Sequence, residues 1–249
     1  MQLALHAEGC AIRMGFLDEQ ARALKPFLKE VAKEEYAKVN AVKFSATYEC
    51  FYSLNSQYLW AAHVIPDSLD RTEGKYRYCL RISIGCSCFD ALLHSVVRPG
   101  EQFTTSAAVR ACGGAYAGPS IRLDTRNYAI DSPPNEKNLK KTADQMIQDA
   151  LGTIDTFMQN VNNLNGGLIS FIMQSAEDHP TEAAFAYMYK EEFSKAKFWL
   201  EYAKNNRKTW QVSYGPKARM IEDILMDYCT VKERGGTWNK ELYIYGLGS

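Results

Sequence analysis

The amino-acid sequence predicts an α+β fold, in which an N-terminal helix and an antiparallel sheet precede a mainly helical C-terminal region. Apolar residues recur at helical spacing near the N-terminus, alternate with period two in several segments before residue 130, and return to helical spacing beyond Pro134. Because strands and helices are segregated along the chain, this pattern favours α+β over a doubly wound α/β fold. The chain has 249 residues, 46% of them hydrophobic, which is enough for a sizeable core.

The elements of the first half follow from these periods. Leu24, Phe27, Leu28 and Val31 lie on one face of a helix predicted within 16–39. Short turns between the alternating segments favour an antiparallel meander of about four to five strands. The predicted strands occupy 42–52, 57–65, 75–84 and one or two segments between 104 and 130, and a short helix is predicted over 89–97.

A proline-rich boundary at 132–135 separates the strands from a long predicted helix that begins at residue 136 and ends near 161. This helix has one broad apolar face, and we expect it to cover the sheet. Four shorter helical segments follow, over 168–176, 182–190, 191–205 and 216–231. The predicted organisation is an α+β domain over 1–165 and a helical region over 166–249, either separate from the first or packed on it as one unit.

Charge and cysteine usage exclude several functional classes. Basic and acidic residues are equal at 29 each, which argues against nucleic-acid or membrane-surface binding. In the predicted strand over 75–84, Tyr76 and Tyr78 alternate with Arg77 and Arg81, so aromatic and basic side chains do not share an RNA-binding face. No apolar run reaches the roughly 18 residues of a membrane span, and the N-terminus lacks the pattern of a signal peptide. With seven cysteines in no scaffold-like rhythm, we expect free thiols and a cytoplasmic location.

One segment near the C-terminus resembles a single tetratricopeptide unit. The residues that carry the resemblance have the spacing of that motif's two packed helices; they are Ala184, Tyr187, Phe193, Ala196, Leu200 and Ala203. Glu191 departs from the motif, which usually has glycine there, and no second copy follows at an offset of 34 residues. The resemblance implies a protein-binding surface, with Tyr187, Phe193 and Trp199 as candidate binding residues.

Three of the cysteines are candidate chemical sites. Cys86 and Cys88 have C-x-C spacing, but they continue the apolar face of the preceding predicted strand, so we interpret both as buried structural thiols. Cys112 precedes Gly113 and Gly114 and is a candidate nucleophile, which would need His63, His94 or His179 as its base. A flexible loop between strands explains the same residues. The sequence predicts no metal site and no cofactor, since it has neither clustered metal-ligand residues nor a nucleotide-binding fingerprint.

These observations favour a non-enzymatic protein that acts by protein–protein interaction, as an adaptor or an immunity-type binder. The alternative is an enzyme or small-ligand-binding protein with a cleft near the Cys112–Pro119 loop. A homo-oligomer is the third hypothesis, in which the tail over 242–245 forms a final strand and extends the sheet of a neighbouring copy.

Overall fold

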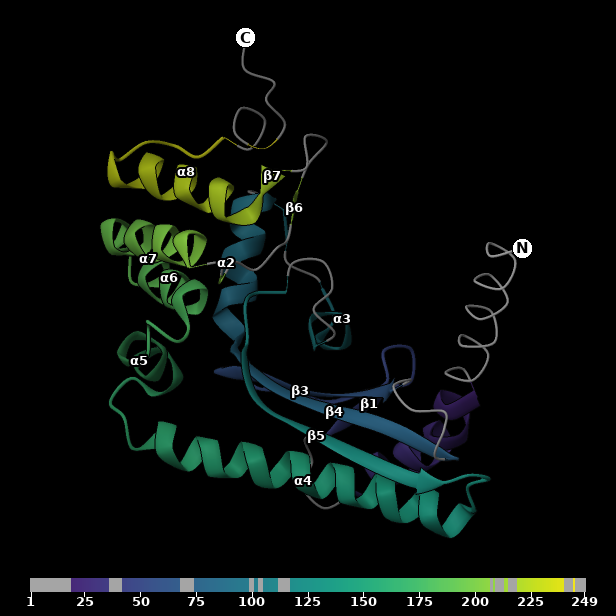
Figure 1. Ribbon diagram of the computed structural model, residues 1–249. Coiled ribbons are helices and arrows are strands. Elements are labelled where there is room, and N and C mark those ends of the chain that lie inside the picture. The colour runs from purple at the N-terminus through teal and green to yellow at the C-terminus, as the bar shows by residue number, and fades with distance from the viewer. Residues whose placement is uncertain are drawn as a thin grey trace, which may run out of the picture. The chain divides into compact units, whose positions relative to one another are not determined.

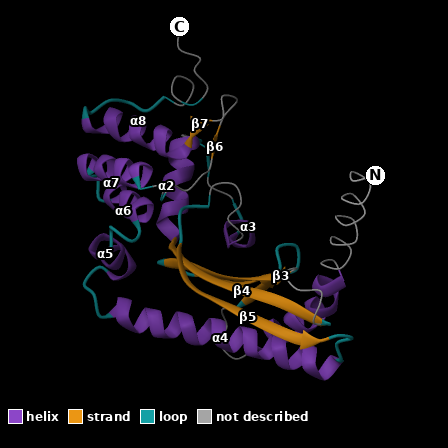
Figure 2. Cartoon of the chain, viewed as in Figure 1, coloured by secondary structure: helices purple, strands orange, loops and turns teal. Residues whose placement is uncertain are grey.

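The structure of the protein is a computed structural model that describes residues 19–35, 42–67, 74–98, 101–102, 105–111, 117–206, 208, 213–214, 219–239 and 244. It confirms the α+β class, with an antiparallel sheet of five strands followed by helices (Figure 1, Figure 2). Within the described residues, no helix is long and apolar enough to cross a membrane.

The sheet is built in chain order. Its strands lie side by side as β1-β2-β3-β4-β5. Their bounds are β1 Lys43–Ser45, β2 Cys50–Leu54, β3 Tyr58–Asp67, β4 Lys75–Cys86 and β5 Ile121–Asp131. The first four strands follow one another through short connections, as the turn signals predict, whereas β5 joins β4 after a long excursion through two helices.

The strand predicted over 42–52 is in fact a hairpin. A turn over 46–49 separates β1 from β2, and Glu49 has a positive φ of 49° in this turn. The two strands pair antiparallel with Ser45 opposite Cys50, and the rings of Phe44 and Phe51 lie 5.3 Å apart. The alternation of polarity runs unbroken through the turn, so period two alone does not reveal that the chain reverses.

β4 shows the alternation that its sequence predicts. Tyr76, Tyr78, Leu80, Ile82 and Ile84 are at most 3% exposed, whereas the residues between them are exposed or half-buried. The buried face meets the helix that includes residues 19–35. There, the hydroxyl of Tyr78 donates to the carbonyl oxygen of Gln20 at 3.0 Å, and that of Tyr76 donates to the Glu19 carboxylate at 2.6 Å.

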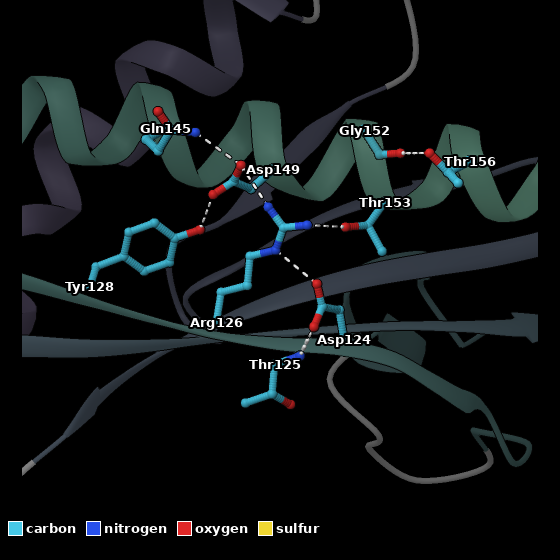
Figure 3. A network of polar contacts seen from close by, with 9 residues as sticks. All are labelled: Asp124, Thr125, Arg126, Tyr128, Gln145, Asp149, Gly152, Thr153 and Thr156. Carbon is cyan, nitrogen blue, oxygen red and sulfur yellow. Dashed lines mark hydrogen bonds and ion pairs between the residues drawn. The ribbon is translucent and has the colours of Figure 1, made fainter.

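The long helix α4 (Glu136–Asn162) lies along the sheet, as predicted, and polar contacts hold it to β5 (Figure 1, Figure 3). The guanidinium of Arg126 is bonded at all three nitrogens. Nε donates to Asp124 at 2.7 Å, Nη1 lies 2.7 Å from Asp149 and Nη2 donates to Thr153 at 3.2 Å. The Tyr128 hydroxyl donates to Asp149 at 2.6 Å. Because Arg126 has no donor nitrogen left over, this network acts as a brace between strand and helix.

Helices make up most of the remaining described residues. Their bounds are α2 Ser87–Val97, α3 Ala107–Ala111, α5 Gly167–Gln174, α6 Pro180–Tyr189, α7 Phe193–Asn205 and α8 Ile221–Glu233, with a two-stranded ribbon of β6 Ser213–Tyr214 and β7 Arg219–Met220. Within the described part of the segment between 104 and 130, predicted as one or two strands, the structure has the helix α3 and the strand β5. The Ser106 hydroxyl accepts the N–H of Val109 at 3.4 Å, and the alanine-rich segment that follows has little strand preference.

The chain divides into two compact units. The first contains 1–53, 60–84 and 122–157, and the second contains 54–59, 85–121 and 158–249. The first therefore holds the helix that includes residues 19–35, most of the sheet and most of α4, and the second holds α2, α3 and α5 to α8. The predicted organisation into 1–165 and 166–249 stays a prediction. The tail over 242–245 lies outside the described residues except for Ile244, which is buried in a turn.

Candidate functional site

The segment that resembles a tetratricopeptide unit forms a helical hairpin of α6 and α7. Its inner face is closely packed, with Ala184, Ala196, Leu200 and Ala203 at 0% exposure. Glu191 lies in the turn between the helices with a φ of 60°, so the position where that motif usually has glycine takes a left-handed conformation here. Small residues along the inner face let the two helices approach closely, as the spacing predicts.

The outer side of α7 carries a second apolar surface. Phe198 is 58% exposed and lies about half a turn round the helix from Ala196 and Leu200. The rings of Phe198 and Trp199 meet edge to face at 5.1 Å, and those of Trp199 and Tyr202 meet at 5.3 Å. We name Phe198, Trp199 and Tyr202 the aromatic patch. Phe198 lies opposite the core face and is exposed, whereas Trp199 and Tyr202 are half-buried.

Charged residues border the aromatic patch. Lys195 lies over the Tyr187 ring at 5.4 Å and pairs with Glu192 at 2.5 Å. Two further ion pairs, Lys204 with Asp223 at 2.6 Å and Lys197 with Glu233, lie on the side of α7 that faces α8, about 150° round the helix from the patch. An apolar centre with a rim of mixed charge is typical of surfaces that bind other proteins.

The three predicted binding residues have different positions. Trp199 belongs to the aromatic patch, and Tyr187 lies at its margin beneath Lys195. Phe193 instead points toward α8, where its ring meets that of Tyr228 at 6.3 Å. Phe198 and Tyr202 were missed by the sequence reasoning. Their spacing of four residues, on the side away from the alanines, is the signal that could have identified them.

Cys112 lies outside the described residues, as do 113–116. The histidines considered as its base are on separate elements: His63 is on β3, His94 is buried in α2, and His179 immediately precedes α6. Burial lowers the pKa of His179. The nucleophile hypothesis for Cys112 stays untested.

The described residues on either side of 112–116, in the predicted Cys112–Pro119 loop and just before it, are anchored at a buried carboxylate. Asp90 of α2 is 5% exposed; it accepts Nε of Arg110 at 2.5 Å and the backbone N–H of Gly118 at 2.5 Å. Arg110 also donates to the carbonyl oxygen of Ser87 at 3.2 Å. A Cβ at Gly118 would lie only 2.7 Å from Cβ of Phe89, so the close approach to α2 requires glycine. Burial raises the pKa of Asp90, against the opposing effects of these two donors.

The C-x-C cysteines differ from the prediction. β4 ends at Cys86, and α2 begins at Ser87, so Cys88 leaves the strand face and is half-buried, whereas Cys86 is 3% exposed. The two thiols are hydrogen-bonded to each other. The strand alternation therefore predicts the burial of Cys86 correctly, whereas its prediction that Cys88 is buried on the same strand face is wrong. Within the described ranges, no group of three or more His, Cys, Asp or Glu side chains is placed to hold a metal ion.

A polar cavity of about 420 Å³ also lies beside the β5–α4 brace. It is lined by Asn127, Tyr128 and Asp131 of β5 and by Asn138, Lys141 and Gln145 of α4. Gln145 and Tyr128 already bind Asp149, so part of this lining serves the brace (Figure 3).

The chain was compared with protein-family models, with curated proteins and with solved structures. No family model matches it, and neither a curated protein nor a solved structure does.

Proposed function

We propose that this protein acts by binding another protein, and that the aromatic patch on α7 is the contact surface. The exposure of Phe198 carries the proposal. A phenylalanine that is 58% exposed opposite a fully packed helix face has no part in folding, yet it presents a large apolar surface to water. Phe198 is supported by Trp199 and Tyr202, which belong to residue types that dominate the binding energy of protein interfaces.

The patch fits a folded partner that offers an apolar groove to a helix. Its three rings lie on the outward ridge of α7 and span about one helical turn, which is the pattern of a helix that binds in a groove. The edge-to-face ring contacts hold the side chains in position before binding, and this lowers the entropy lost on association. The mixed charges at the margin supply a polar rim.

The expected contribution of Phe198 follows from its exposed area. With 58% of a ring side chain of roughly 200 Å² exposed, about 120 Å² is available for burial, which corresponds to about 3 kcal/mol. Phe198→Ala should therefore weaken partner binding by up to about a hundredfold. It should change the free energy of unfolding by no more than about 0.5 kcal/mol, because the side chain lies outside the core.

The test is a quantitative affinity capture from lysate of the protein's own host, comparing the wild type with Phe198→Glu and with Tyr189→Glu. Tyr189 is a matched control, because it is 50% exposed in the same hairpin but lies at the end of α6. We expect one partner in near-stoichiometric amount with the wild type and the control, and its loss with Phe198→Glu. If both variants retain the same proteins as the wild type, the proposal is wrong. Light scattering of the purified protein identifies the case in which the partner is a second copy of this chain.

A further inference from the structure

Cys86 and Cys88 lie where β4 passes into α2. Cys86 is the last residue of the strand and the N-cap of the helix, with extended dihedral angles, and Cys88 is the second residue of the helix. The Cys86 side chain is buried and the Cys88 side chain is half-buried. The two thiols are hydrogen-bonded to each other, and the Cys88 side chain is the more exposed of the two.

The change from strand to helix brings the pair within bridging distance. In an extended strand, residues i and i+2 have Cα atoms about 6.6 Å or more apart and side chains parallel on one face. Ser87 already belongs to the helix, so the Cα atoms of its two neighbours are separated by the helical spacing of about 5.4 Å. This separation is close to the value of about 5.5–6 Å that disulfides most often have, whereas the separation in a strand lies at the upper limit of their range.

The electrostatic surroundings give the two sulfurs different roles. The hydrogen bond from the Cys86 S–H lowers the pKa of Cys88, and the backbone N–H at the start of the helix acts in the same direction. The same hydrogen bond, together with burial, raises the pKa of Cys86 well above its usual range. The carboxylate of Asp90 opposes ionisation of both thiols, but Asp90 is paired with Arg110. Ionisation is therefore favoured at the half-buried Cys88, and the buried Cys86 retains its proton.

We propose that Cys86 and Cys88 form a thiol–disulfide exchange site that reacts with low-molecular-weight disulfides, with Cys88 as the attacking thiol and Cys86 as the resolving thiol. In the first step, the Cys88 thiolate attacks a disulfide R–S–S–R; a Cys88–S–S–R bond forms, and R–S⁻ leaves. In the second, Cys86 transfers its proton to R–S⁻ and its sulfur attacks Sγ of Cys88. A Cys86–Cys88 disulfide forms and the second R–S⁻ leaves. The two protein thiols have then lost two electrons, and R–S–S–R has gained them.

The first step activates the second. The leading cause that holds the proton on Cys86 is its hydrogen bond to the Cys88 sulfur, and the charge on Cys88 adds to it. Both effects end when Cys88 is capped in the mixed disulfide, so the pKa of Cys86 falls at the moment when its thiolate is needed. This inference concerns a part of the second unit that is separate from the aromatic patch, so it does not depend on the proposed function.

Oxidised glutathione is the probe, and mass spectrometry of tryptic peptides is the readout. The peptide over 82–110 contains Cys86 and Cys88 alone, whereas Cys79, half-buried on the same strand, falls in the separate peptide over 78–81 and is the control. In the native protein we expect peptide 82–110 to lose the mass of two hydrogens, at a rate about tenfold or more above glutathione addition at Cys79. Cys86→Ser should stop at a glutathione adduct on Cys88, and Cys88→Ser should abolish the fast reaction.

The proposal is overturned if Cys86→Ser forms no adduct, if Cys88→Ser reacts as fast as the wild type, or if Cys79 reacts as fast as Cys88. Cys86 is buried, so Cys86→Ala is measured beside Cys86→Ser, and circular dichroism establishes that the variants are folded. An adduct on Cys88 in either folded variant supports the attacking role. In the wild type, accumulation of a stable mixed disulfide without the loss of two hydrogens would refute the resolving role of Cys86.

Discussion

Glu182→Gln should stabilise the protein above neutral pH and leave its stability unchanged in acid. Glu182 is the third residue of α6, between Thr181 at 4% exposure and Ala183 at 0%. Burial raises the pKa of its carboxyl from an ordinary value of 4.5 to about 7, although the helix-start N–H of Glu182 itself opposes the shift. The native state therefore favours the neutral acid, whereas the unfolded chain ionises near 4.5.

The sign and size of the effect follow from linkage. Below pH 4.5 Glu182 is protonated in both the folded and the unfolded state, so it does not lower the free energy of unfolding. Between about 4.5 and 7 the unfolded state releases its proton first, so the free energy of unfolding falls as the pH rises. A difference of about 2.5 pKa units corresponds to a loss of about 3 kcal/mol at pH 8, because each unit is worth about 1.4 kcal/mol. Glutamine keeps the shape of the side chain and cannot ionise, so the variant avoids this loss.

The assay is urea unfolding of the wild type and Glu182→Gln at pH 4, 6 and 8, followed by circular dichroism. We expect the two to coincide at pH 4 and to differ by about 3 kcal/mol at pH 8, with the variant more stable. Glu201→Gln is the control, since Glu201 is an exposed glutamate on α7 and its replacement should have little effect at any of these pH values. A variant no more stable than the wild type at pH 8 would refute the reasoning.

Three further predictions concern the folded state. Arg110→Met should lower the free energy of unfolding by about 3–5 kcal/mol, because it leaves Asp90 buried without its partner. Adding Asp90→Asn to this variant should recover part of the loss. If the effects of the two substitutions on the free energy of unfolding are additive, the prediction is wrong. Asp149→Ala should cost about 2 kcal/mol and Tyr128→Phe about 1 kcal/mol in urea unfolding, since Asp149 accepts bonds from several donors and Tyr128 provides one of them; equal costs would argue against a shared network. Glu191→Gly should raise the thermal midpoint and increase the free energy of unfolding by about 1 kcal/mol, because the φ of 60° at this position favours glycine. An unchanged or lower midpoint would show that the left-handed backbone at Glu191 does not destabilise the protein.

Local patterning predicts much of the fold. The alternation in β4 identifies the buried face of that strand, and the apolar face of α4 predicts a helix that covers the sheet. The α6–α7 hairpin follows from the spacing of its apolar residues, although that spacing includes the turn residue Glu191 in the second helix. Each of these features arises from a repeat of 2 or 3.6 residues, and such a repeat is fully contained in the sequence.

Places where the chain changes conformation without changing its polarity are not predictable in this way. The hairpin within 42–52 preserves the alternation through its turn, and Cys88 continues the strand pattern after the helix has begun. In both cases the residues alternate in polarity as in a strand, but the backbone does not continue as the predicted strand. The Cys86–Cys88 contact depends on that change, so the sequence gives the C-x-C spacing but not the close approach of the sulfurs.

The sequence by itself therefore determines the α+β class, the buried faces of the main elements and the spacing of the helical hairpin. Only the tertiary structure decides which distant side chains meet. Asp90 and Arg110 are 20 residues apart, and the burial of their ion pair depends on how α3 returns to α2. The exposure of Phe198 and the desolvation of Glu182 depend likewise on which helix faces find a neighbour. The physical reason is that periodicity is a local property of the chain, whereas desolvation and charge pairing depend on contacts between segments that are far apart in sequence.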